Sequence, residues 1–274
     1  MGWLIGNGVD WRGVFLAAAD VMLVILLANL LLLNESPHEI GETEPQANPL
    51  NLVDEHEGSS KAALKWALTA FLRSRAFWII CLLSLGMTLL RETFNTWTPT
   101  YFIEVAVLSK AEAASENALF PLFGVVSVLL AGFISDKLGR NGRTMIILIR
   151  LLLSSAGLWL LGHTRFGGSP AMPVWLVASV AFTLIAPYSH LAGAISLDFG
   201  GKQGSATASG IIDGVGYLGG VLAGGTVARI SVSFGWEGAF TALAGVALLS
   251  SLAAALFLIE QRRSVKTKIK VEAT

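Results

Sequence analysis

Long apolar stretches alternate with short polar segments along most of the chain. A membrane-spanning helix needs about 20 mostly apolar residues, and seven stretches meet that requirement. They cover residues 13–33, 76–98, 117–135, 144–163, 172–194, 206–229 and 237–259. The pattern therefore predicts an all-α membrane protein, with one first helix followed by a bundle of six.

The longest polar interruption separates the first span from the other six. Residues 34–60 are rich in acidic residues and carry three prolines, so they are too polar to pack a core. Residues 61–75 intersperse apolar residues with basic ones, which is typical of an amphipathic helix on a membrane surface. We therefore divide the chain into a first helix (1–33), a cytoplasmic linker with this amphipathic segment (34–75), a six-helix unit (76–260) and a basic tail (261–274).

Composition supports the membrane class. Hydrophobic residues make up 54% of the chain and charged residues 14%, whereas soluble domains carry about 25% charged residues. Most lysines and arginines near the span ends fall on one side of the predicted membrane, which predicts that this side and the C-terminus are cytoplasmic. We expect an integral protein of the plasma (inner) membrane whose immediate partner is the lipid bilayer. A single cysteine, Cys81, excludes a disulfide framework.

A short basic loop joins the third and fourth predicted spans. Residues 132–143 read GFISDKLGRNGR, which resembles the signature loop G-x-x-x-D-[RK]-x-G-[RK]-[RK] of the major facilitator superfamily. Asn141 departs from that pattern, because a second basic residue is usual there. The resemblance implies that four residues of the loop hold a cytoplasmic gate: Asp136, Lys137, Arg140 and Arg143.

The order of the elements is similar to one part of such a facilitator. One helix, a charged linker and six helices resemble helix six, the central loop and the C-terminal half of a twelve-helix protein. The sequence WRGVF at residues 11–15 is similar to the start of helix six. The resemblance implies two inverted three-helix repeats, and as partner either a missing N-terminal half or a second chain.

Arg91 and Glu92 interrupt the second predicted span about two-thirds of the way along it. A charge near the centre of a spanning helix costs about 2.5–3.5 kcal/mol, so Arg91 should face a cavity or a partner. Its planar guanidinium suits bidentate binding of a phosphate. It could equally pair with an acid on a neighbouring helix or reach toward the outer surface.

Further stretches resemble the organophosphate:phosphate antiporters, which include glycerol-3-phosphate and hexose-phosphate transporters. LLR at 89–91 with WTPTY at 97–101 is similar to their helix seven, and residues 204–240 carry motifs similar to helices eleven and twelve. The resemblance implies that a sugar phosphate or glycerol phosphate is exchanged for inorganic phosphate by alternating access. Arg91 would bind the phosphate with a second arginine from the N-terminal half, while Trp97 and Tyr101 shape the outer cavity.

Two other polar residues lie inside predicted spans. Asp213 could pair with a base, carry a proton or contact the substrate. His190 follows Pro187, which removes a backbone hydrogen bond and bends a helix. The imidazole of His190 could therefore satisfy a freed carbonyl, or it could meet a phosphate or a proton.

Small residues mark one helix face. Gly216, Gly220 and Gly224 form a G-x-x-x-G-x-x-x-G ridge that lets two helices approach closely. The ridge could pack statically or slide during a conformational change. Arg150, less than two turns into its predicted span, is expected to extend its side chain toward the membrane surface.

The sequence contains no nucleotide-binding loop, metal-spaced His/Cys set or nucleophile elbow. We therefore expect no enzyme activity, no cofactor and no metal. The basic tail suits anionic lipid rather than nucleic acid. Two alternatives to the antiporter remain: a proton-coupled facilitator of an organic acid or sugar, in which Arg91 pairs with Glu92 or Asp213, and a non-transporting sensor of sugar phosphate.

Overall fold

The computed structural model describes residues 4, 8–34, 39, 41, 50–53, 60–138, 142–164 and 169–272; within these, the side chains of 60–64, 136, 192, 202 and 264–272 are not part of the description. The described residues form helices and no strand, as predicted. The helices are α2 (Trp11–Leu32), α3 (Ser60–Arg73), α4 (Arg75–Glu104), α5 (Lys110–Glu116), α6 (Leu119–Leu138), α7 (Gly142–His163), α8 (Ala171–His190), the π-helix η2 (Leu191–Ile195) and α9 (Ser196–Glu272).

The long helix α9 consists of three helical segments. Its backbone leaves helical geometry at Gly201 (φ 56°, ψ −155°) and at Gly235 (φ 68°, ψ −179°), conformations that favour glycine. Six stretches among the described residues are long and apolar enough to cross a membrane, and Gly235 divides the last of them, Gln203–Arg263, into two. The predicted all-α membrane fold with about seven spans is confirmed.

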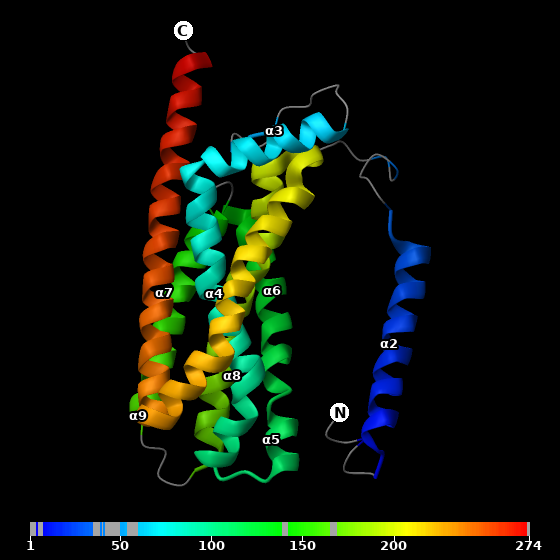
Figure 1. The fold of residues 1–274 in the computed structure, drawn as a ribbon, viewed down its shortest axis with the longest axis vertical. Helices are drawn as coiled ribbons and strands as arrows, with labels where there is room; N and C mark the ends of the chain where they lie inside the picture. Colours follow the sequence, from blue (N-terminus) through cyan, green and yellow to red (C-terminus); the bar gives the residue numbers. More distant parts are fainter. Residues whose placement is uncertain are drawn as a thin grey trace.

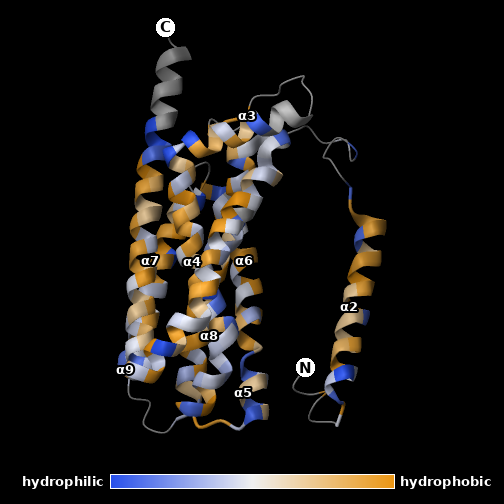
Figure 2. Cartoon of the chain, in the orientation of Figure 1, coloured by the Kyte–Doolittle hydropathy of each residue, from blue (hydrophilic) through white to orange (hydrophobic). Residues whose placement is uncertain are grey.

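In the described part of the chain, α4, α6, α7, α8 and α9 form the bundle, and α9 supplies two of its six spans because of the bend at Gly235. α4 and α7 pack on α9, and α6 and α7 pack on α8, as Figure 1 shows. α2 stands apart from the bundle and buries none of its residues. Apolar residues cover the spans, and hydrophilic residues gather near their ends (Figure 2).

The predicted amphipathic segment is the helix α3, which crosses one end of the bundle (Figure 1). Its apolar side packs on the protein: Phe71 is fully buried and stacks on Phe77 of α4, with ring centroids 4.9 Å apart. The preceding linker residues join the same contact, because the Leu52 amide donates to the Phe199 carbonyl at 2.9 Å. Phe71 and Val53 also lie against Gly204, so α3 and the linker end are attached to α9 close to its bend at Gly201.

Candidate functional site

Arg91 forms an ion pair with its neighbour on α4. Arg91 Nη2 donates to Glu92 Oε1 at 2.5 Å, and the two side chains are 22% and 25% exposed. The guanidinium also lies over the ring of Tyr188 from α8, with Cζ 4.0 Å from the ring centroid. A cation over an aromatic face is stabilised by the ring quadrupole. The charge of Arg91 is therefore held inside the bundle by one carboxylate and one ring.

The helix α9 brings further polar groups to the same place. The phenol of Tyr188 interacts electrostatically with Asp213 and Tyr217 as well as with Arg91 and Glu92. These five residues, from α4, α8 and α9, are called the arginine cluster below. The sequence reasoning selected Arg91 and Asp213 but missed both tyrosines. Because the chain has only three tyrosines and two of them follow residues already singled out, Pro187 and Gly216, these positions offered a usable signal.

Trp97 and Tyr101 do not join the arginine cluster. They follow Arg91 by six and ten residues, so they lie about 9 and 15 Å further along the helix and on other sides of it. Trp97 Nε1 donates to the Ala223 carbonyl at 3.0 Å. Tyr101 is 1% exposed and packs edge-on against Phe240, with ring centroids 4.9 Å apart. A cavity of only about 10 Å³ lies between these aromatic residues, which is too small for a phosphate. In this arrangement both residues pack α4 on α9 instead of lining an outer cavity.

His190 is buried at the junction of α8 and η2, with 9% exposure. It stands two residues after Tyr188, and residues two apart on a helix do not share a face. The wide π turn of η2 begins directly after it, and such turns are frequent at functional sites.

One end of the bundle carries two of the predicted gate residues, Arg143 and Lys137. Arg143 at the start of α7 donates through Nη1 to both carboxylate oxygens of Asp198 in α9, at 3.2 and 3.0 Å. Lys137 lies over the Phe133 ring, with Nζ 4.2 Å from its centroid. Arg140 and the side chain of Asp136 lie outside the described residues. Asp198 was missed by the sequence reasoning, although it is the sole acid between residues 137 and 212.

The glycine contact differs from the predicted ridge. Gly216 lies against Ser84 and Thr88 of α4, and a Cβ at Gly220 would lie 3.3 Å from Glu92 Cγ. Nothing lies within 4 Å of the Cβ position of Gly224, so this residue is not part of the contact. The closest approach is at Gly219, whose Cβ would fall against the Leu85 carbonyl. The i, i+4 spacing of these glycines predicted a close contact between two helices. It did not indicate that α4 and α9 have already diverged at Gly224.

Arg150 does not extend toward a membrane surface. Its Nη1 donates to the Phe182 carbonyl at 2.9 Å and also to Ser127 Oγ. The side chain thereby connects α7 to α6 and α8. Neutral oxygens satisfy this charge, so Arg150 is a structural tie in the bundle.

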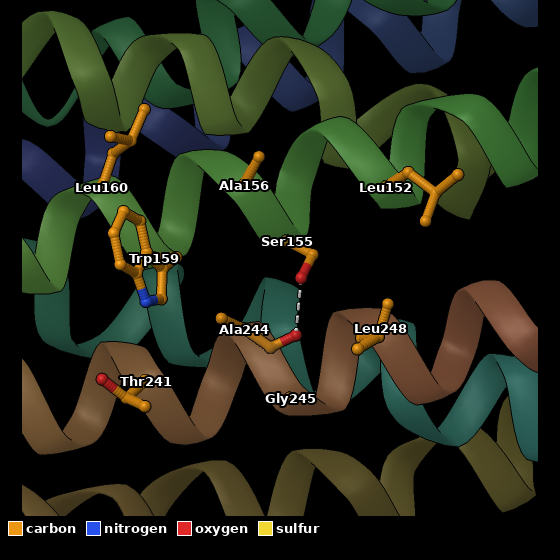
Figure 3. A pocket seen from close by; sticks show the side chains of 9 residues that line it. All are labelled: Leu152, Ser155, Ala156, Trp159, Leu160, Thr241, Ala244, Gly245 and Leu248. Atoms are coloured by element: carbon orange, nitrogen blue, oxygen red, sulfur yellow. Dashed lines mark hydrogen bonds between the residues drawn. The ribbon is translucent and has the colours of Figure 1, made fainter.

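A shallow groove also runs between α7 and α9, with a volume of about 560 Å³ (Figure 3). Its lining is apolar apart from Thr241 and Ser155, and Ser155 Oγ donates to the Ala244 carbonyl at 2.9 Å. Because it contains no charged side chain, we take the arginine cluster as the candidate site.

Comparison with known proteins gives a consistent set of relatives. Residues 1–224 match the family described as the Major Facilitator Superfamily. A probable hexose phosphate transport protein of Chlamydia trachomatis serovar D is 25% identical over 270 residues, covering 90% of this chain and 57% of that protein. The membrane sensor protein UhpC of Escherichia coli K12 is 24% identical over 257 residues, with 92% and 57% covered.

A glycerol-3-phosphate transporter of Bacillus subtilis strain 168 is 23% identical over 256 residues, covering 90% of this chain and 56% of that protein. The chain thus spans a little over half the length of the curated relatives it matches. The resemblance to phosphate-ester transporters inferred from the sequence motifs is confirmed by these names.

Proposed function

Because this chain belongs to the Major Facilitator Superfamily, we propose that it supplies the C-terminal half of a transporter for phosphorylated solutes. Membership in this superfamily identifies the chain as part of an integral membrane transport protein rather than an enzyme. The transporter would exchange a sugar phosphate or glycerol phosphate for inorganic phosphate. The observation that carries this proposal is Arg91, a guanidinium held among α4, α8 and α9 inside the bundle.

The chemistry of Arg91 suits a phosphate. Its fixed fork of N–H donors matches two phosphate oxygens at once, and charge-assisted hydrogen bonds of this kind are about twice as strong as neutral ones. Partial burial strengthens the attraction, because the local dielectric constant is lower than that of water. One guanidinium does not neutralise a phosphate dianion, so a second cation would come from an N-terminal half or a second chain.

The remaining predicted residues take supporting roles in this proposal. Trp97 and Tyr101 hold α4 against α9, which fixes the direction of the helix that carries Arg91. The Arg143–Asp198 pair, with Asp136 and Lys137 at the end of α6 and with Arg140, would hold the gate end closed. We place that end and the C-terminus in the cytoplasm of a cell bounded by the plasma (inner) membrane.

One observation favours a second candidate. Glu92 already neutralises Arg91, which is the arrangement expected of a proton-coupled facilitator for an organic acid or sugar. A third candidate is a sensor that binds sugar phosphate without moving it, since one relative is named as a membrane sensor protein.

Exchange of labelled phosphate separates these functions. The chain, together with the helices that complete it, is reconstituted in liposomes loaded with phosphate and exposed to sugar phosphates or glycerol phosphate. We expect exchange that falls at least about tenfold in Arg91→Lys, because lysine cannot bind bidentately. Arg150→Lys is the matched control, as it changes another arginine within a span. Exchange unaffected by Arg91→Lys would contradict the proposal, and binding without exchange would identify a sensor.

A further inference from the structure

We infer that Glu92 is an exchangeable counter-ion: a phosphate group displaces it from Arg91, and the released carboxylate takes up a proton. This inference rests on the proposed function, because it concerns the same guanidinium. It assigns phosphate binding a linked proton uptake and makes Glu92 the residue that sets anion affinity.

The ion pair is not one that helix geometry favours. Adjacent residues on a helix point about 100° apart, so Arg91 and Glu92 do not naturally face each other. Their side chains nevertheless meet at 2.5 Å, with roughly a quarter or less of each exposed. Across the described residues, the pair bridges α4 only to itself, so its loss would not separate two helices. These features suit a contact that can be exchanged more than a contact that holds the fold.

Glu92 occupies the part of Arg91 that a phosphate needs. It binds Nη2, the nitrogen that shares one edge of the guanidinium with Nε. Nε is buried and has no hydrogen-bond partner among the described residues. A phosphate that binds this edge through two oxygens would satisfy Nε and compete with Glu92 for Nη2. Nη2 has two N–H groups, so displacement of Glu92 also depends on charge: a phosphate dianion at this edge repels the carboxylate from the same nitrogen.

The charges around this edge explain why Glu92 would take up a proton when a phosphate binds. Besides Glu92, the titratable groups that act on Arg91 are Tyr188 from α8 and Tyr217 from α9. Asp213 from α9 acts on Tyr188 and so completes the arginine cluster. With both acids ionised, the arginine cluster carries one negative charge in excess, and a phosphate dianion of charge about −2 would add to it. Like charges at close range in a partly buried site disfavour ionisation. Glu92 is the acid that loses its cation, so it takes a proton from water while the phosphate oxygens accept the Arg91 N–H groups.

Packing confines Glu92 to this region. Its Cγ lies 3.3 Å from the position of a Cβ at Gly220, so the side chain runs along the bare backbone of α9. The displaced carboxylate would stay near the bound phosphate instead of moving freely into water, which makes its neutralisation necessary.

Calorimetry in two buffers of different protonation enthalpy tests the inference. The chain with its completing helices, in lipid nanodiscs, is titrated with inorganic phosphate and with sulfate, a tetrahedral dianion that does not itself titrate near neutrality. We expect the wild type to take up about one proton per anion. Glu92→Gln should bind both anions about tenfold more tightly at pH 8 and lose the proton uptake with sulfate. Glu104→Gln, a control on the same helix, should behave as wild type.

The outcomes separate the inference from the proposed function. Phosphate binding that Arg91→Lys abolishes, but whose affinity and proton uptake are unchanged in Glu92→Gln, would overturn the inference and leave the function in place. Weaker binding in Glu92→Gln would overturn it as well. Absence of phosphate binding in both the wild type and Glu92→Gln would overturn the function and the inference together.

Discussion

Replacing Gly219 with alanine should push α4 and α9 apart. An alanine Cβ would fall against the Leu85 carbonyl oxygen, 3.0 Å from the Leu85 carbonyl carbon and 3.2 Å from the Leu89 amide nitrogen. All three atoms belong to backbone, so no side-chain rotation relieves the contact. Gly224, five residues further along the same segment, has nothing within 4 Å of its Cβ position and provides the matched control.

The two substitutions share one energy term and differ in another. Both gain up to about 1 kcal/mol of helix propensity. Gly219→Ala alone adds an overpacking cost of about 1–3 kcal/mol. The Gly219→Ala variant should therefore be less stable than Gly224→Ala by about 1–3 kcal/mol, which corresponds to several degrees in melting temperature.

The single cysteine makes the measurement direct. Cys81 on α4 is fully buried, so a thiol-reactive fluorophore reports its exposure when the bundle opens on heating. Melting curves in one detergent for the wild type and the two variants give the comparison. If Gly219→Ala melts at or above the temperature of Gly224→Ala, the close helix approach at Gly219 is refuted.

Two further substitutions test the bend and the crossing helix. Gly235→Ala should lower stability by about 1–3 kcal/mol, because φ 68° and ψ −179° lie in a region almost restricted to glycine. Gly225→Ala, within a helical segment, should not lower stability in this way. Equal melting temperatures for the two variants would contradict the prediction. Phe71→Ala should weaken the packing of α3 by about 3–5 kcal/mol, since the ring is fully buried. The control is Leu72→Ala, because the Leu72 side chain is 54% exposed. We expect faster proteolysis of α3 in Phe71→Ala than in Leu72→Ala, and similar rates would argue against this packing.

The spans were predictable because each depends on a local property. About 20 apolar residues in a row suffice to identify a spanning helix, whatever it packs against. The start of α4 was also set locally, since Ser74 Oγ accepts from the Phe77 amide and caps the helix. Even α9, which has no polar loop between its last two spans, was divided correctly from its apolar pattern.

The candidate site was only partly predictable, because its members come from three helices. Arg91 was found because a charge inside a span is costly wherever it faces. Tyr188 and Tyr217 carry no such penalty, so their contact with Arg91 depends on how α8 and α9 are rotated. Tyr101 illustrates the opposite case, since its place in a motif suggested a cavity while the rotation of α4 buries it. Rotation about the helix axis is the variable that periodicity leaves open in a bundle whose outer face is also apolar.

The bend at Gly235 has a practical consequence for topology mapping. Only one residue separates the two helical segments there, so this end of the last hairpin offers no loop that could accept an epitope or a cleavage site. The Val105–Ser109 connection lies close by, because Glu104 accepts from Trp236 Nε1 at 2.7 Å. Val107 within it is 84% exposed. Since Cys81 is buried, Val107→Cys would give a single accessible thiol in the native background, and a membrane-impermeant reagent would report which compartment this end faces.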